Sequence, residues 1–268
     1  MQKRKGWDNN QFFSDYCPTL FIKEKITMNK KFFTGSKVSS ENALFQNHVS
    51  NYSNYLYDQN FIWLKKEPST LELDDINTKF MSKWLNDSPL FKFDFKPSAK
   101  FIATLESKGF FTEQMLIFTI PSSKLVFQES QNFEISKVTT NTLDKFLEVK
   151  FNQDIIYGEE FANINKNFLL SLFKEGILDI FIATLNQKVI GFVNVIKHIS
   201  NIEIYDIYTL PKFRNRYVAT ALQQYVGKFY NDTTIVVIAD YADTPKEMYA
   251  KLGYEISGSF YQAQKYDK

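Results

Sequence analysis

The residues best suited to binding chemistry lie between Leu210 and Val226, in the stretch LPKFRNRYVATALQQYV. A proline follows a strand-like run, Arg214 and Arg216 stand two positions apart, and a helical pattern begins at once. The start of a helix leaves about four backbone N–H groups without intrahelical acceptors and carries partial positive charge, so it binds phosphate readily. The stretch therefore predicts a local anion site, although two arginines at a helix start are also typical of a solvent-facing surface.

Several elements must position this stretch. The apolar periodicity predicts a strand at 202–210, a helix at 218–230, a buried strand at 233–239, a helix at 245–252 and a final strand from Tyr254. Upstream it predicts a strand at 133–138, two helices near 142–151 and 163–174, and a hairpin at 179–197 that turns at Asn186 and Gln187. This alternation indicates a mixed sheet with some parallel pairing, in which the apolar run IVVIA forms a central strand.

Two motifs carry a resemblance to a known family. The segment IYTLPKFRNRYVATALQQYV resembles the acyl-CoA-binding signature of the GCN5-related N-acetyltransferase (GNAT) superfamily, in which an R/Q-x-x-G-x-G/A turn opens a helix after a proline-ended strand. The residues in the family's places are Pro211, Arg214, Ala219, Ala221 and Leu222. A second segment, MYAKLGYE at 248–255, is similar to the family's Y-x-x-x-G-F/Y ending, with Tyr249, Gly253 and Tyr254 in register. The resemblance covers 133–268 and implies an α/β (α+β) GNAT fold, a mixed and partly splayed central sheet flanked by helices.

The resemblance also implies that acetyl-CoA (coenzyme A) is bound where the sheet splays. The implied cofactor-binding residues are Ile207, Tyr208 and Thr209 beside the acyl and pantetheine part, and Arg214, Asn215, Arg216, Tyr217, Val218, Ala219 and Thr220 at the pyrophosphate. Tyr217 stands where the family has its first motif glycine. We expect it to keep ordinary helical dihedral angles, with its side chain either crowding the pyrophosphate or pointing away along the helix.

The implied reaction is direct attack of an amine on the thioester, which needs a base for the ammonium proton and a hydrogen-bond donor for the leaving thiolate. Tyr249 takes the place of the family's thiol-side tyrosine, and a phenol with a pKa of about 10 donates a hydrogen bond at neutral pH without being ionised. Glu203 and Asp206 on the strand before Pro211 are the candidate bases. Their odd spacing predicts that they face opposite sides of the sheet, and Glu203 is the preferred base.

Composition restricts the other classes of function. The chain of 268 residues has 32 basic and 30 acidic side chains, so no global field gathers nucleic acid or anionic membrane. One cysteine, Cys17, and two histidines, His48 and His198, exclude a disulfide framework and leave too few soft ligands for zinc, so no metal is expected. We expect both histidines at the surface and Cys17 to be unreactive. No signal peptide or membrane helix of about 18 apolar residues is recognisable, which predicts a cytoplasmic protein, monomeric or homodimeric.

The first half of the chain contains a faint echo of the second. Residues 100–120 and 246–266 both read as a helix, a glycine and a strand, a similarity that either reflects a second GNAT-like unit or arises by chance. The polar segment 121–131 is the candidate linker, which divides the chain into a mixed α/β domain at 1–125 and a GNAT domain at 132–268. In the first domain Leu105 stands at the position of Tyr249 and no R-x-x-G-x-G/A turn precedes it, so that unit is expected to be degenerate and to bind no cofactor.

These observations predict an acetyl-CoA-dependent N-acyltransferase that acts on an amine of a small-molecule or peptide acceptor. The first domain is expected to pack beside the second and to shape the acceptor pocket. The alternative is a catalytically weak or inactive protein that binds CoA or a partner, which is suggested by Tyr217 and by the undecided base.

Overall fold

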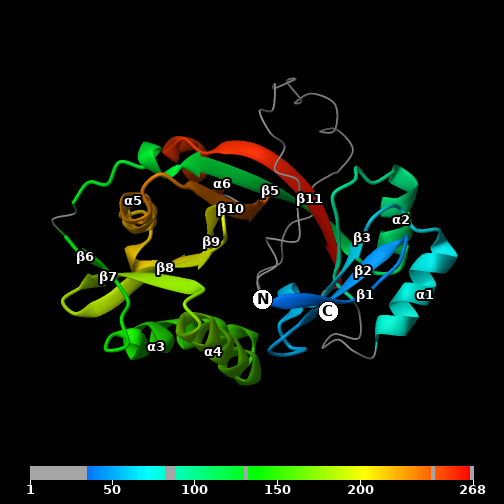
Figure 1. The fold of residues 1–268 in the computed structure, drawn as a ribbon, viewed down its shortest axis with the longest axis horizontal. Helices are drawn as coiled ribbons and strands as arrows, with labels where there is room; N and C mark the ends of the chain where they lie inside the picture. Colours follow the sequence, from blue (N-terminus) through cyan, green and yellow to red (C-terminus); the bar gives the residue numbers. More distant parts are fainter. Residues whose placement is uncertain (1–34, 82–88, 130–131, 243–244, 266–268) are drawn as a thin grey trace.

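A computed structural model describes residues 35–81, 89–129, 132–242 and 245–265 of the chain (Figure 1). Within these residues, eleven strands form one sheet in the order β1-β2-β3-β4-β11-β5-β10-β9-β8-β7-β6. The sheet arches across the molecule and helices cover it (Figure 1). This mixed sheet with flanking helices confirms the predicted fold class. Among the described helices, none combines the length and apolar character needed to cross a membrane.

The second half follows the predicted order of elements. It contains β6 (Glu134–Lys137), α3 (Leu143–Asp154), α4 (Glu159–Lys174), β7 (Leu178–Leu185), β8 (Lys188–Lys197), β9 (Asn201–Thr209), α5 (Val218–Phe229), β10 (Thr234–Asp240), α6 (Pro245–Leu252) and β11 (Glu255–Gln264). Short 3-10 turns lie at η4 (Ile155–Tyr157) and η5 (Pro211–Phe213). The β7–β8 hairpin turns at Asn186 and Gln187, both with positive φ, as the sequence indicated.

The first half is a shorter version of the same arrangement. It contains β1 (Ser36–Glu41), β2 (Phe45–Ser50), η2 (Tyr57–Gln59), β3 (Phe61–Leu64), α1 (Thr70–Met81), β4 (Phe91–Phe93), α2 (Ala99–Ser107), β5 (Phe111–Pro121) and η3 (Ser122–Lys124). The β3-α1-β4 unit joins parallel strands, and so does the β9-α5-β10 unit. The predicted echo of a helix, a glycine and a strand is α2-β5 in one half and α6-β11 in the other. The first half is therefore consistent with a second GNAT-like unit.

The two halves exchange their last strands. β5 of the first half lies between β10 and β11 and pairs with both in antiparallel register. In return, β11 of the second half lies between β4 and β5. The sheet is therefore continuous because each half completes the other.

Three apolar clusters fill the two faces of the sheet. One cluster joins β7–β10 to α5 and α6 on one face, and another joins β7 and β8 to α3 and α4 on the opposite face. The third packs α1 and α2 against β2–β5. On β10, Val236 belongs to the cluster of the first half, whereas Ile235 and Val237 belong to the α5–α6 cluster. This burial on both faces confirms that the run IVVIA forms a central strand.

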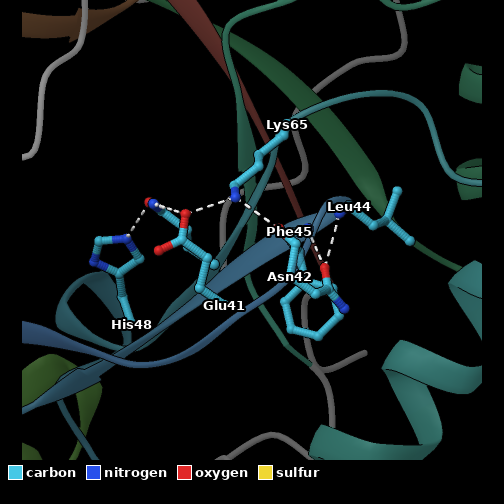
Figure 2. A network of polar contacts seen from close by, with 7 residues as sticks. Glu41, Asn42, Leu44, Phe45, His48 and Lys65 are labelled. Carbon is cyan, nitrogen blue, oxygen red and sulfur yellow. Dashed lines mark hydrogen bonds and ion pairs between the residues drawn. The ribbon is translucent and has the colours of Figure 1, made fainter.

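The hairpin at the outer edge of the first half is closed by polar contacts (Figure 2). The Asn42 side-chain oxygen accepts the backbone N–H groups of Leu44 and Phe45, both at 2.8 Å. Lys65, which follows β3, donates from Nζ to Glu41 and to the Asn42 carbonyl, each at 2.6 Å. These contacts fix the β1–β2 turn against β3.

The segment predicted as a linker begins as packed structure. After β5, Ser122 and Leu125 are buried, and Leu125 lies directly beneath Gly227 of α5, where an added Cβ would meet the Leu125 Cβ at 2.5 Å. α5 is thus held both to the strands beneath it and to the segment that leaves β5.

Candidate functional site

The turn that leads into α5 presents a row of backbone N–H groups. Asn215 and Tyr217 adopt positive φ values of 60° and 68°. The N–H groups of residues 215–220 have no backbone acceptor within the part of the chain that the structure describes, and the first helical bond runs from the Ala221 N–H to the Tyr217 carbonyl at 2.9 Å. Such a row of donors at a helix start suits an anion.

Tyr217 reaches this geometry in an unexpected way. The prediction of ordinary helical dihedral angles is wrong, because Tyr217 caps α5 in the left-handed conformation with φ 68° and ψ 0°. That is the conformation that glycine adopts most easily. The ring does not turn back over the N–H groups: its hydroxyl donates to Gln224 Oε1 at 2.5 Å, two turns along the helix, and the residue is 47% exposed. Of the two alternatives, the side chain therefore points away along the helix.

The two arginines of the turn lie at its exposed rim. Arg214 donates from Nε to the Thr209 carbonyl at 3.3 Å, which fastens the turn to the end of β9. The Arg216 guanidinium lies 5.7 Å from the centre of the Phe213 ring. Both guanidinium groups thus contribute positive charge beside the N–H row without being buried.

β9 and β10 diverge next to this turn. Their parallel register covers Asn201–Ile204 and Thr234–Val237, and it ends at the Val237–Ile204 pair. Beyond that pair, β9 continues along β8 to Thr209 and β10 continues along β5 to Asp240. The central sheet is thus partly splayed, as predicted, and Ile207, Tyr208 and Thr209 lie on the diverging part of β9.

A bulge in β9 changes which side chains share a face of the sheet. Asn194 of β8 lies opposite Asp206, but the next residue, Val195, lies opposite Ile204, so Tyr205 is an extra residue in β9. Asp206 therefore shares the α3–α4 face of the sheet with Glu203. The prediction that the two carboxylates face opposite sides is wrong because strict alternation fails at the bulge.

Asp206 is held in an ion-pair network. Lys150 of α3 lies 2.9 Å from Asp206 and 2.9 Å from Asp154, and Asp154 also accepts from Asn165 at 2.7 Å. Burial alone would lower the pKa of Lys150, but the two carboxylates outweigh it and raise that pKa above its usual range. The ion pair of Asp206 with Lys150 thus connects β9 to α3.

Glu203 has a different partner, which the sequence did not reveal. The His198 ring Nε2 lies 2.9 Å from the Glu203 carboxylate, and the two side chains are 7% and 8% exposed. His48 is also buried, stacked on Phe61 with ring centres 4.3 Å apart. The prediction that both histidines lie at the surface is therefore wrong. His198 and Glu203 lie only five positions apart in the sequence, and the turn between β8 and β9 brings their side chains together. This short separation was the sequence signal that could have predicted the pair.

The first half contributes groups near Glu203. Lys92 of β4 is buried, and its burial lowers its pKa, while the charges of Asp58 and Glu203 oppose that shift. Tyr205 of the bulge is partly buried, which raises its pKa, and Gln59 from η2 hydrogen-bonds to it. The α3–α4 side of β9 is therefore lined in part by the first half.

Tyr249 lies on the opposite face of the sheet. It is 4% exposed, and its ring packs against Phe118 at 5.2 Å and Tyr254 at 5.5 Å between ring centres. Phe118 is paired with Val237, the last residue of β10 that still pairs with β9. Tyr249 therefore lies at the level where the splay opens, with Glu203 on the other face. Cys17 lies outside the described residues.

Two other features lie apart from this site. A surface hollow of about 600 Å³ lies beside β6 and the β7–β8 turn, and none of its described lining residues is a predicted site residue. Among the described residues, no group of three or more histidine, cysteine or acidic side chains is arranged to hold a metal ion.

A comparison with protein families matches the part of the chain that contains β9, α5 and α6. Residues 177–256 match the family model described as an acetyltransferase (GNAT) domain. None of the curated proteins compared with the sequence matches it.

Solved structures match over most of the chain. A conserved protein of unknown function from Staphylococcus epidermidis is similar with a TM-score of 0.78 and 23% identity, over 91% of this chain and 99% of that one. A GCN5-related N-acetyltransferase from Kribbella flavida gives a TM-score of 0.60 and 10% identity, over 87% and 91%. A tandem GNAT protein from the clavulanic acid biosynthesis pathway gives 0.51 and 7%, over 82% and 78%.

These likenesses, at low identity, concern the fold. Together with the splayed strands and the motif turn, they confirm the resemblance: residues 177–256 match the GNAT family model, and the fold of the chain is similar to that of GNAT proteins, tandem ones included.

Proposed function

We propose that the protein is an acetyl-CoA-dependent N-acyltransferase whose working site lies in residues 132–268. The observation that carries the proposal is the splay between β9 and β10, which opens beside the N–H row of residues 215–220. A thioester carrier needs both features, because its diphosphate requires donors and its arm requires a gap between strands. The family match supports acyl transfer in general terms.

The residues fit such a carrier. The backbone N–H groups of 215–220 would hold the diphosphate, with Arg214 and Arg216 at the rim, and Ile207, Tyr208 and Thr209 would line the arm. Thr209 supports this assignment because its buried hydroxyl has no hydrogen-bond partner among the described residues. Bound acetyl-CoA supplies a thioester carbonyl carbon that an amine can attack.

Glu203 and Tyr249 are the residues that we assign to proton transfer. Glu203 would accept a proton from the ammonium group, directly or through one water molecule, and the lone pair that this frees on the nitrogen would form the new C–N bond. Tyr249 would donate its hydroxyl hydrogen bond to the sulfur as the C–S bond breaks, since a phenol stays protonated at neutral pH. Their positions on opposite faces suit a carrier that enters from the α5–α6 side and an acceptor that enters from the α3–α4 side.

The acceptor side would be shaped by both halves. Lys92, Asp58 and Gln59 of the first half lie near Glu203 and Tyr205, so we propose that the first half forms part of the acceptor wall and carries no cofactor of its own. The acceptor would be a small-molecule or peptide amine. We propose that the protein is a monomer or a homodimer and that it acts in the cytoplasm.

A second candidate is a protein that binds CoA without turnover. It is favoured by the engagement of both carboxylates, Glu203 with His198 and Asp206 with Lys150. Titration with acetyl-CoA followed by thiol-release assays over a panel of amines separates the two. Release that depends on an amine supports the enzyme, binding without release on any amine supports the second candidate, and no binding at millimolar acetyl-CoA contradicts both.

A further inference from the structure

The side of α5 that faces α6 carries a buried amide with an unused acceptor. Gln223 is fully buried, yet its Oε1 has no hydrogen-bond partner among the described residues. Its Nε2 makes only long contacts, 3.4 Å to the Ala219 carbonyl and 3.7 Å to Met248 Sδ. A buried acceptor without a partner costs stability, so such a group in a folded protein calls for an explanation.

The position of Gln223 explains why its acceptor has no partner. Gly227 lies one turn further along the same side of α5 and contacts Ser122 and Leu125, which follow β5. At its other side, α5 contacts Gly191 of β8 through Val218. The helix therefore crosses above β9 and β10, and Gln223 faces the β10 side, between α5 and Met248 of α6. That is the α5–α6 face of the splay.

A second unused polar group lies on the same face. The Thr209 hydroxyl, near Val218 and Gly191, is buried without a partner at the end of β9. One unpaired group at the end of β9 and another on the helix above it suit an extended ligand with its own polar groups. A pantetheine arm has two amides and is such a ligand.

We propose that Gln223 is the side chain that recognises the pantetheine arm, with Oε1 accepting a hydrogen bond from one of its amide N–H groups. This inference rests on the proposed function and adds a residue that is not one of the matched positions of either motif. Met248 gives way when the arm enters, because an unbranched thioether changes rotamer at little cost. Gln223 therefore selects for the arm and is indifferent to the nucleotide end of the carrier.

The test compares two ligands by isothermal titration: CoA, and 3′-phosphoadenosine 5′-diphosphate, which lacks the arm. Gln223→Met keeps the length of the side chain and removes the acceptor. We expect it to weaken CoA binding about tenfold, the effect of one hydrogen bond, and to leave nucleotide binding unchanged. Equal CoA affinity in the variant, or an equal loss for both ligands, overturns the role of Gln223.

A measurement on wild-type protein covers the case in which the variant does not fold. The side-chain amide resonances of Gln223 in ¹⁵N-labelled protein should shift on addition of CoA and stay in place with the nucleotide alone. If CoA binds and the chemical shifts of these resonances do not change, the inference is overturned. Wild-type protein that binds neither ligand contradicts the proposed function itself, so the two failures are distinguishable.

Discussion

Single residues decide how the N–H row before α5 is presented. Tyr217 adopts the left-handed conformation that glycine adopts most easily, and the hydrogen bond to Gln224 holds its ring against the outer side of the helix. The motif in the sequence identified the position, but the dihedral angles of Tyr217 depend on the turn that begins at Pro211. A bulky residue is thus compatible with a free N–H row.

Replacing this tyrosine tests that account. Tyr217→Gly keeps the left-handed cap without strain and removes the ring. Because the ring already points away, we expect the dissociation constant for CoA, measured by titration, to change less than about threefold, an energy below 1 kcal/mol. A tenfold gain in affinity would instead mean that the ring obstructs the site.

The carboxylate of Glu203 is the proposed base. Glu203→Gln keeps its shape and a hydrogen-bonding partner for His198 but cannot accept a proton. Loss of a general base costs about 100-fold or more in kcat, so we expect that decrease with an unchanged CoA dissociation constant. The assay is thiol release with the most reactive amine of the panel. An unaltered rate would mean that another residue is the base.

The hydroxyl of Tyr249 is the proposed donor to the leaving sulfur. Tyr249→Phe retains the packing against Phe118 and Tyr254 and removes only the donor. We expect kcat to fall by at least about tenfold, while CoA affinity and thermal stability stay close to wild type. If affinity falls and turnover per bound carrier does not, Tyr249 is a packing residue.

At the scale of elements, α3 is tied to the bulge of β9. The sequence predicted both elements from periodicity, but not the bulge, because an extra residue is visible only when the strand pairs with its neighbour. The bulge places Asp206 where Lys150 of α3 reaches it. The ion pair thus holds the α3–α4 face of β9 in register with α3.

Removing the lysine should loosen this junction. Lys150 is 8% exposed, so Lys150→Met leaves Asp154 and Asp206 without their cation, and the free energy of unfolding in urea should fall by about 3 kcal/mol. Exposed Lys145 on the same helix provides the control, since Lys145→Met should cost less than about 0.5 kcal/mol.

The pH dependence of that difference follows from the raised pKa of Lys150. A cation whose pKa is higher in the folded state stabilises fully below its unfolded pKa of 10.5 and loses that contribution as pH rises through the folded value. The difference between wild type and Lys150→Met should therefore be constant from about pH 6 to 9 and shrink only in more alkaline solution. A difference that disappears near neutral pH would contradict the ion pair.

At the scale of the whole molecule, the two halves share a sheet by exchanging strands. Helix and strand order in the second half followed from apolar periodicity and two motifs, and the α2-β5 echo of α6-β11 was visible in the sequence. The exchange was not, because local patterns do not specify which strand β5 or β11 pairs with. The proposed units 1–125 and 132–268 therefore each lack a central strand when considered alone.

Separated fragments test this dependence. Residues 132–268 lack β5, which pairs with β10 and β11, so the fragment alone should show no cooperative thermal unfolding. Coexpression with 1–125 should restore a stable complex that copurifies. Cooperative unfolding of isolated 132–268 at the wild-type temperature would show that the exchange contributes little.

The central claim is that a CoA diphosphate is held by the N–H groups of residues 215–220 while its arm lies between β9 and β10. The most direct measurement is a crystal structure of the protein with CoA. We expect diphosphate oxygens within hydrogen-bonding distance of those N–H groups and the arm between residues 205–209 and 238–240. A carrier bound elsewhere, or strands β9 and β10 closed together along their length, would contradict it.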